Sequence, residues 1–272
     1  MGQTVSQISE YTNCCDGRIP FLSSNQVNKT SSSTQPTNFS DYRKFEQARN
    51  SSNLATLVQL LSSTEKLPKA YRTASVHPWA RAPETIGALV SAHLAVLIST
   101  TDVADSLVDL DVTAHLTEFL KSDSPDRVHA ASVTLVFLTE KSSLACSLLC
   151  DDDVPKVTLD LVSSGGAGFQ LTLLSLYRNL AKIKSEILAV SGKDVAFLLT
   201  NILSSQLSKR QTPQTNDFVL ECLQILSDLV ELSAAFKGLV KNDRLESLLE
   251  VTKVSEDVDI AEETKRLVTI LD

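Results

Sequence analysis

An internal repeat of about 41 residues is the feature of this sequence that most restricts its fold. A large aliphatic residue is followed three and four residues later by further aliphatic residues, and this short pattern recurs along the chain. Its copies start at Leu57, Leu116, Val157 (a weaker copy), Leu199 and Leu245, and the last four starts are 41, 42 and 46 residues apart. Such a period is typical of stacked helical repeats, in which each unit buries its apolar face only against its neighbours.

A row of leucines recurs at a fixed distance from this pattern. Each leucine of the row lies 19 residues before the start of the next copy. The row consists of Leu97, Leu138, Leu180 and Leu226. Two landmarks that hold one offset through four units indicate a true repeat. We therefore predict helical units at about 102–141, 142–182, 183–232 and 233–272, after a partial first unit with helices near 54–63 and 84–100.

The unit at 183–232 shows the expected helices most clearly. A short helix at 185–190 is predicted to end at Gly192, since glycine readily takes the left-handed conformation at a helix C-terminus. Asp194 is then predicted to cap a second helix, because its side chain can accept from free amides. After a polar loop, a longer helix covers 218–230 and is apolar on more than one face, as a helix between two neighbouring repeats requires.

Two segments of the chain resemble armadillo repeats. The run ILAVSGKDVAFLLTNIL (187–203) resembles the short helix, the turn with a small residue and glycine, and the helix ending in Leu-Leu of that family. The run LLSLYRNLAK (173–182) resembles its third helix, with Asn179 where the family often has an asparagine that lines the groove. The resemblance covers about residues 54–272. It implies an all-α, right-handed α-solenoid of about four to five armadillo-like repeats, with HEAT-like repeats as the alternative.

The amino-acid composition is consistent with a helical fold and excludes several classes of function. Apolar residues make up 43% of the chain and aromatic residues only 5%, so the core is predicted to be aliphatic. The net charge of −8 argues against a nucleic-acid partner, because phosphates are bound by clustered Lys and Arg. Five cysteines without framework spacing indicate reduced thiols in a cytosolic compartment. No signal peptide is visible, and no run approaches the roughly 18 apolar residues that span a bilayer.

Loops and one asparagine are the candidate partner-binding features. An insertion at 64–83 carries Trp79 among prolines, where an indole can anchor a partner or pack against the first repeats. A shorter loop is predicted at 206–214. Asn179 could hydrogen-bond the main chain of an extended peptide in the groove. The equivalent positions in the other units hold no asparagine, so we expect apolar and acidic contacts and not an importin-like asparagine ladder; they are Val96, Phe137 and Ile225.

The N-terminal arm, residues 1–45, is rich in Ser, Thr, Asn and Gln and is predicted to be disordered. Gly2 and Ser6 match the N-myristoylation pattern, in which the acyl chain joins the amine of Gly2. One myristoyl chain binds a membrane only marginally, at about 10⁴ M⁻¹. The pair Cys14 and Cys15 could supply a second anchor by S-palmitoylation. The alternative is a common Met-Gly start with two inert cysteines.

An acylated arm that leads directly into armadillo repeats is similar to the vacuole-anchored armadillo proteins of fungi and to the armadillo-repeats-only proteins of apicomplexan secretory organelles. The cysteine pair lies further from Gly2 here than in those families. The resemblance implies a non-enzymatic adaptor on the cytosolic face of an organelle membrane, whose groove recruits motor or tethering proteins. The alternative is a soluble cytoplasmic armadillo-type regulator, such as a chaperone nucleotide-exchange cofactor.

Four groups of residues carry side chains or turns that could support chemistry, and none of them predicts a catalytic, metal or cofactor site. The acids 151–153 are interpreted as caps of the next helix, where they meet the positive end of its dipole. Cys146 and Cys150 are interpreted as buried helix thiols, since no ligand partners them in sequence. The glycine-rich run 164–168 lacks the Lys-Ser/Thr of a phosphate loop and is interpreted as an inter-helix turn. The four histidines form no recognisable triad. We therefore predict a protein partner and no small-molecule substrate.

Overall fold

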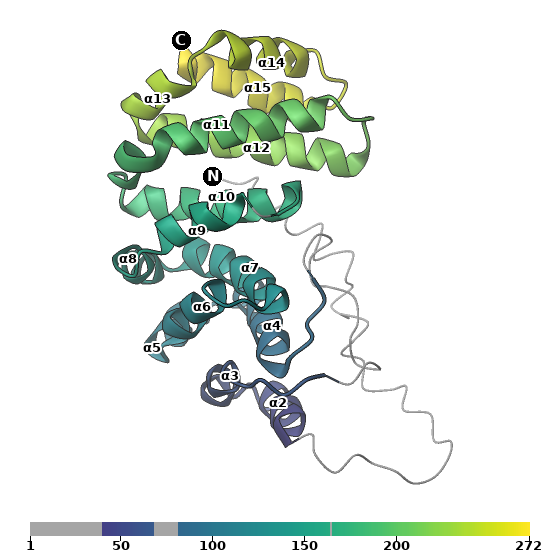
Figure 1. The fold of residues 1–272 in the computed structure, drawn as a ribbon, viewed down its shortest axis with the longest axis vertical. Helices are drawn as coiled ribbons and strands as arrows, with labels where there is room; N and C mark the ends of the chain where they lie inside the picture. The colour runs from purple at the N-terminus through teal and green to yellow at the C-terminus, as the bar shows by residue number, and fades with distance from the viewer. Residues whose placement is uncertain (1–39, 68–80, 164) are drawn as a thin grey trace. The chain divides into compact units, whose positions relative to one another are not determined.

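The computed structural model describes residues 40–67, 81–163 and 165–272. Contacts divide the chain into two units, 1–39 and 40–272, and every described residue belongs to the second. Within these ranges the chain is a stack of helices, and the only extended pairing in them is one antiparallel bridge between Lys66 and Thr85 (Figure 1). The fold is an all-α solenoid, as predicted.

The helices fall into five successive groups, and the last four groups coincide with the units predicted from the repeat. Their bounds are α2 (Ser40–Asn50), α3 (Leu54–Leu60) and α4 (Ile86–Thr100); α5 (Ala104–Asp109), α6 (Val112–Leu120) and α7 (Pro125–Lys141); α8 (Ser143–Asp151), α9 (Val154–Val162) and α10 (Ala167–Ile183); α11 (Ile187–Leu207) and α12 (Pro213–Leu232); α13 (Ala234–Val240), α14 (Asp243–Lys253) and α15 (Val258–Leu271). We call the last helix of each group, α4, α7, α10, α12 and α15, its third helix. Each third helix packs against the third helix of the next group.

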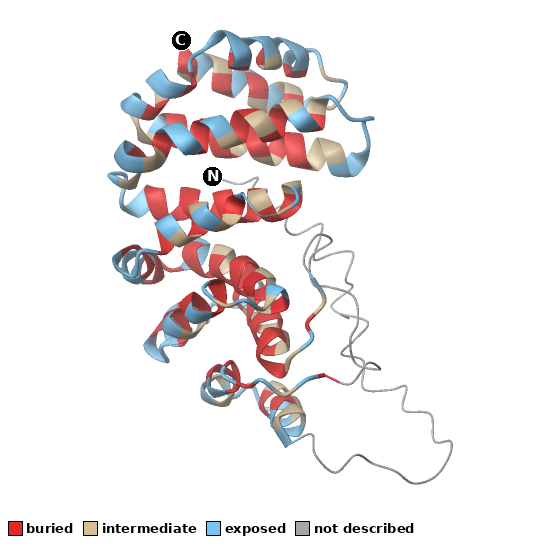
Figure 2. Cartoon of the chain, viewed as in Figure 1, coloured by how far each residue is buried: buried red, intermediate tan, exposed pale blue. Residues whose placement is uncertain are grey.

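The leucines that revealed the repeat form the core of the stack (Figure 2). Seven of the nine positions of the two rows are fully buried: Leu57, Leu116, Leu138, Leu180, Leu199, Leu226 and Leu245. Leu97 and Val157 are half-buried. Burying one leucine side chain contributes about 2 kcal/mol, so repeating the same positions spreads stability along the whole solenoid.

The unit at 183–232 departs from its predicted helices. We expected a helix end at Gly192 and a new helix capped by Asp194, but α11 runs through both residues without a break. The physical reason lies in α13: a Cβ on Gly192 would stand 3.3 Å from Phe236 Cδ2 and 3.4 Å from Leu239 Cδ1. Glycine here permits a close approach between helices and does not end one.

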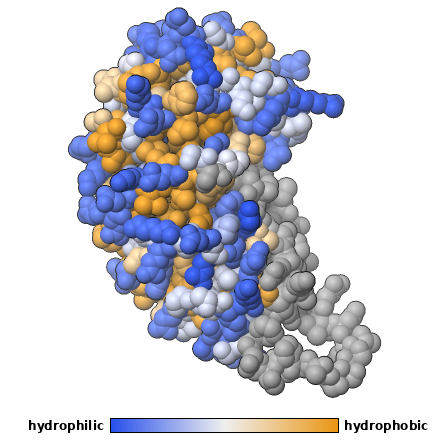
Figure 3. Space-filling model, in the orientation of Figure 1, coloured by the Kyte–Doolittle hydropathy of each residue, from blue (hydrophilic) through white to orange (hydrophobic). Residues whose placement is uncertain are grey.

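Helix α11 has the length and apolar composition of a membrane span. In the structure, 44% of its apolar window is buried inside the solenoid, and α11 packs against α12 and α13. The core helix of a repeat stack meets the same length and composition criterion, so we interpret α11 as a packing element. Its exposed side bears Val190 and Phe197, and Figure 3 shows apolar patches among hydrophilic side chains in this view.

The boundary of the N-terminal arm differs from the prediction. Residues 40–45, which we expected to be disordered, belong to α2. Phe45 and Ala48 of α2 are buried in the same core as α3 and α4. The carboxylate of Glu65 accepts from the backbone amides of Asp41 at 3.2 Å and Tyr42 at 3.4 Å, so a residue outside the helix satisfies its first turn. The solenoid therefore begins by Ser40.

The described residues show how the 64–83 insertion is held at its two ends, and they shorten the loop predicted at 206–214. The two ends of the 64–83 insertion are joined, because Leu67 N donates to Glu84 O at 2.8 Å. The carboxylate of Asp126 accepts from the backbone amides of Glu84 at 2.9 Å and Thr85 at 3.2 Å, which holds one end at the start of α4. The loop predicted at 206–214 shrinks to 208–212, since Thr212 caps α12.

Candidate functional site

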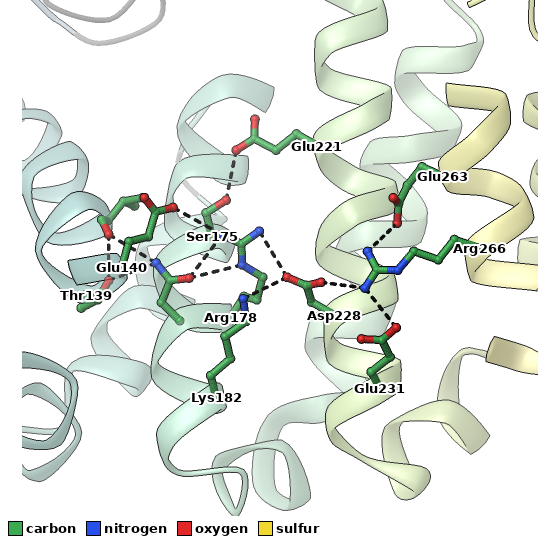
Figure 4. A network of polar contacts seen from close by, with 12 residues as sticks. Thr139, Glu140, Ser175, Arg178, Lys182, Glu221, Asp228, Glu231, Glu263 and Arg266 are labelled. Atoms are coloured by element: carbon green, nitrogen blue, oxygen red, sulfur yellow. Dashed lines mark hydrogen bonds and ion pairs between the residues drawn. The ribbon is translucent and has the colours of Figure 1, made fainter. Parts of the chain in front are cut away.

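A continuous network of charged side chains crosses four third helices (Figure 4). Glu140, Lys182 and Asp228 each lie two residues after the row leucine of their unit. Two residues are about 200° of helix rotation, so these side chains point away from the leucine core. Stacking of the units then places one beside the next. We call the surface that bears this network on α7, α10, α12 and α15 the third-helix face.

Arg178 is the centre of the network. Its side chain is only 5% exposed, and its guanidinium lies 3.7 Å from a carboxylate oxygen of Glu140 on α7 and 3.7 Å from one of Asp228 on α12. Its Nε and Nη2 also donate to Asn179 Oδ1 at 3.3 and 3.2 Å. A planar guanidinium with five donors can serve several acceptors at once, so Arg178 ties three consecutive units together.

Asp228 extends the network to the C-terminal unit. Its carboxylate lies 3.1 Å from Lys182 Nζ and 3.3 Å from Arg266 Nη2 of α15. Arg266 in turn pairs with Glu231 at 3.0 Å and with Glu263 at 3.2 Å. Exposed pairs of this kind contribute about 0–1 kcal/mol each, so the nearly buried Arg178 dominates the energetics of the network.

Glu221 of α12 has a neutral hydroxyl group as its hydrogen-bond partner. It accepts from Ser175 Oγ at 3.0 Å, and no ion pair of the described residues includes it. Burial raises the pKa of Glu221; the negative charges of Glu140 and Asp217 act in the same direction, against Ser175 and Arg178. Burial likewise raises the pKa of Glu140. Burial is therefore the main cause that disfavours the ionised form of both carboxylates.

The third-helix face as a whole is acidic. Along α12, acidic residues and one glutamine follow one another at steps of four and three, which places them on one face of the helix: Asp217, Glu221, Gln224, Asp228 and Glu231. In the ion pairs of the network among the described residues, four carboxylates meet three cations. The carboxylates are Glu140, Asp228, Glu231 and Glu263, and the cations are Arg178, Lys182 and Arg266.

Asn179 has a structural position that corrects our prediction. Its side chain is buried, at 4% exposure. Its Nδ2 donates to Val136 O at 3.3 Å and to Thr139 Oγ1 at 3.1 Å, while its Oδ1 accepts twice from Arg178. These contacts use the full hydrogen-bonding capacity of an amide. Asn179 therefore joins α7 to α10, and its amide has no capacity left for a peptide.

The remaining candidate residues divide into two groups. Gly2, Cys14, Cys15 and Trp79 lie outside the described residues. The interpretation of the helix thiols is confirmed, since Cys146 and Cys150 are buried on α8. Burial raises the pKa of Cys146 to about 11, with a smaller contribution from Cys150, so the thiol stays protonated. No group of three or more His, Cys, Asp or Glu residues with metal-binding geometry occurs in the described parts of the chain.

The acids at 151–153 act differently from our prediction. Asp153 does occupy the position before α9, but its side chain makes no capping hydrogen bond, and its backbone has a positive φ of 58°. Asp151 lies at the end of α8 and pairs with Lys184 at 2.9 Å. These residues shape the turn between α8 and α9 and tie it to the end of α10.

The pattern of any single helix does not reveal this network, because its ion pairs join residues of neighbouring units. The residues two positions after the row leucines are Ser99, Glu140, Lys182 and Asp228. From Glu140 onward the charge changes sign from one unit to the next, which is the pattern of complementary neighbours in a stack. Comparing the same position across units would have predicted the ion pairs of Lys182 and Asp228.

Comparisons with known proteins show which solved structures have a similar architecture. No family model matches the sequence, and no curated protein sequence matches it. Among solved structures, the armadillo-repeats-only protein from Plasmodium falciparum is similar with a TM-score of 0.69 and 27% identity, over 89% of this chain and 100% of that one.

Two designed armadillo repeat proteins, one of them in complex with the peptide (KR)4, are similar with a TM-score of 0.59 each. Their sequences are 11% and 10% identical to this one, over 84% of this chain and 85% of each of theirs. Similarity at this level supports the fold alone. The chain therefore has the fold of an armadillo-repeat solenoid and is similar to the armadillo-repeats-only protein of Plasmodium falciparum.

Proposed function

We propose that this protein is a non-enzymatic adaptor held on the cytosolic face of an organelle membrane by N-terminal acylation. The third-helix face binds a protein partner, and acyl chains on Gly2 and on Cys14 and Cys15 attach the solenoid to the membrane. The observation that carries the proposal is a charged, partly exposed binding face in the same chain as an arm that begins with the myristoylation pattern.

The fold supports the binding part of this proposal. An armadillo solenoid is a scaffold for protein binding, since stacked repeats build an extended surface without a deep pocket. One designed armadillo structure is a complex with a peptide, so this architecture accommodates one. The resemblance to lipid-anchored armadillo proteins supports a motor or tethering protein as the partner.

The arm supports the anchoring part. A myristoyl chain alone gives reversible attachment, and one or two palmitoyl chains added at the membrane would make it stable. The alternative is a soluble armadillo-type regulator, which would need no acylation and would bind its partner without residues 1–45.

Acyl labelling tests the anchor directly. In eukaryotic cells fed alkynyl myristate, we expect the C-terminally tagged protein to be labelled, Gly2→Ala to lose all label, and the matched arm variant Gly17→Ala to keep it. Alkynyl palmitate is expected to label the native protein but neither Cys14→Ser/Cys15→Ser nor Gly2→Ala, because the first chain delivers the cysteines to the membrane enzyme. Myristate label that persists in Gly2→Ala would remove the anchor from the proposal.

A further inference from the structure

We propose that Thr212 is a phosphorylation site, modified by a proline-directed protein kinase. The kinase transfers the terminal phosphoryl group of a nucleoside triphosphate to Thr212 Oγ1. The new O–P bond forms as the bond to the departing nucleoside diphosphate breaks, and the hydroxyl proton passes to the base of the kinase. This inference goes beyond the adaptor function and uses no part of the lipid anchor.

The sequence offers two acceptors to a kinase of this class. Such kinases modify a serine or threonine that stands directly before a proline. Of the 8 prolines in the chain, Pro125 follows Ser124 and Pro213 follows Thr212, while the other six follow residues without a hydroxyl group. The serines and threonines of residues 1–39 are therefore not acceptors of this kind. The structure decides between the two positions that remain.

Thr212 lies in an exposed connection between two long helices. Helix α11 ends at Leu207 and α12 begins at Pro213, and residues 208–214 are all exposed. The connection projects from the side of the stack in Figure 1, where Figure 3 shows hydrophilic side chains. The backbone of Thr212 is extended, with φ −141° and ψ 159°, and the following proline disfavours a helical alternative. Kinases bind their acceptor residue in such an extended conformation.

The kinase reaches the hydroxyl when the first turn of α12 opens. Thr212 Oγ1 accepts from Thr215 N at 3.2 Å, and Thr215 Oγ1 accepts from Thr212 N at 2.7 Å. Pro213 has no amide hydrogen to lose from a helix, and Gln214 is exposed. Opening therefore breaks the capping contacts and leaves the buried Phe218 in place. Exposed helix ends open at a low cost in free energy.

Ser124 lies in a different environment. It is half-buried, and its Oγ donates to Asp126 Oδ1 at 2.5 Å. Asp126 is itself buried and accepts from the backbone amides of Glu84 and Thr85 at the start of α4. A phosphate on Ser124 would stand against this carboxylate and be repelled by it. Exposing Ser124 to a kinase would also disturb the start of α4. The structure therefore favours Thr212.

Phosphorylation changes the charge of the connection. Residues 208–214 include Lys209 and Arg210 and no acidic residue. A phosphothreonine carries a charge of about −1.5 to −2 at pH 7, so it brings the segment close to neutral. A phosphate oxygen can also replace the hydroxyl as acceptor of the Thr215 amide, at the positive end of the α12 dipole. We therefore expect the modified protein to be slightly more stable.

Phosphorylation in vitro tests the inference. The full, non-acylated chain is incubated with a purified mitogen-activated, proline-directed kinase and ATP, and the phosphate is located by mass spectrometry. We expect one phosphate, on Thr212. Thr212→Ala should lose all incorporation and Pro213→Ala most of it, because the second variant lacks the proline that the kinase recognises. Ser124→Ala should be phosphorylated like the native chain, and so should Thr212→Ser, which keeps both the hydroxyl and the helix cap.

The variants separate recognition from damage to the fold. Thr212→Ala also removes a helix cap, whereas Pro213→Ala keeps the capping hydroxyl, so a loss of phosphate shared by both does not come from an uncapped α12. Phosphate found on Ser124, or equal incorporation in Thr212→Ala and the native chain, would overturn the inference. Phosphorylation should raise the melting temperature by about 1–3 °C. An unchanged or lower melting temperature would contradict a phosphate held at the start of α12.

Discussion

Arg178→Met is expected to lower the free energy of unfolding by about 3 kcal/mol. The substitution keeps a long apolar stem but removes the cation that forms an ion pair with Glu140, and it takes two donors from Asn179. Because the Arg178 side chain is 5% exposed, water cannot replace these donors easily. The carboxylates left beside it would then lie partly buried without their partner. Urea unfolding followed by circular dichroism measures the effect.

Lys182→Met is the matched control. It removes a cation from the next turn of α10, but the Lys182 side chain is 45% exposed and forms its ion pair with Asp228, which keeps Arg178 and Arg266. We expect a loss below about 1 kcal/mol, as for other exposed ion pairs. If the two variants were equally stable, Arg178 would not be the centre that ties α7, α10 and α12 together.

The second large effect is expected at the start of α4. Gly87→Ala should destabilise the protein by about 2–3 kcal/mol through overpacking. Its amide donates to Ser63 O at 3.2 Å, so the backbone of 61–63 passes directly over the helix. A Cβ at this position would press on Leu61 O, would lie 2.8 Å from Ser63 O, and would touch the Phe119 ring at 3.0 Å. Two of these three obstacles are backbone atoms, which cannot move aside as a flexible side chain can.

Gly238→Ala separates this steric effect from the general preference of helices for alanine. Gly238 lies in α13, and a Cβ there would meet no atom within 4 Å. Alanine at an exposed helical position should therefore stabilise the protein, by up to about 1 kcal/mol. Thermal unfolding of the two variants should show shifts of opposite sign. A harmless Gly87→Ala would mean that the 61–63 segment is not held against α4.

The repeat made the architecture predictable. Leu138, Leu180 and Leu226 each recur at the same place in a unit and are fully buried, so the positions that carry the core also carry the sequence signal. The C-terminal ends of α7 and α10 therefore fall within one residue of the unit ends at 141 and 182 that the period predicts. A single helix cannot show such a signal, because apolar periodicity alone does not tell which unit it packs against.

The features that could not be predicted depend on contacts between distant segments. Helix α2 has Phe45 as its main apolar contact and takes its capping from Glu65, so neither periodicity nor a local cap marks it. The continuity of α11 depends on Phe236, 44 residues beyond Gly192 in the sequence. Locally, a glycine before a polar residue is also the usual signal of a helix end.

Asn179 shows the same limit at the candidate site. Its place in the third helix matched a position that lines the groove in armadillo proteins, and the sequence could not show that Thr139 and Arg178 would occupy its amide. Part of the charged network could be predicted from the sequence, since Glu140, Lys182 and Asp228 occupy one repeat position. The environment of Glu221 could not be predicted, because it depends on burial and on its distance from Glu140.

Imaging of the protein in a eukaryotic cell tests the adaptor proposal most directly. The native chain with a C-terminal fluorescent tag is compared with Gly2→Ala and with Cys14→Ala/Cys15→Ala. We expect the native protein to decorate the cytosolic face of an organelle membrane and both variants to become diffuse, since one acyl chain alone gives only marginal attachment. A native protein as diffuse as its two variants would contradict the membrane adaptor and would leave a soluble armadillo-type regulator.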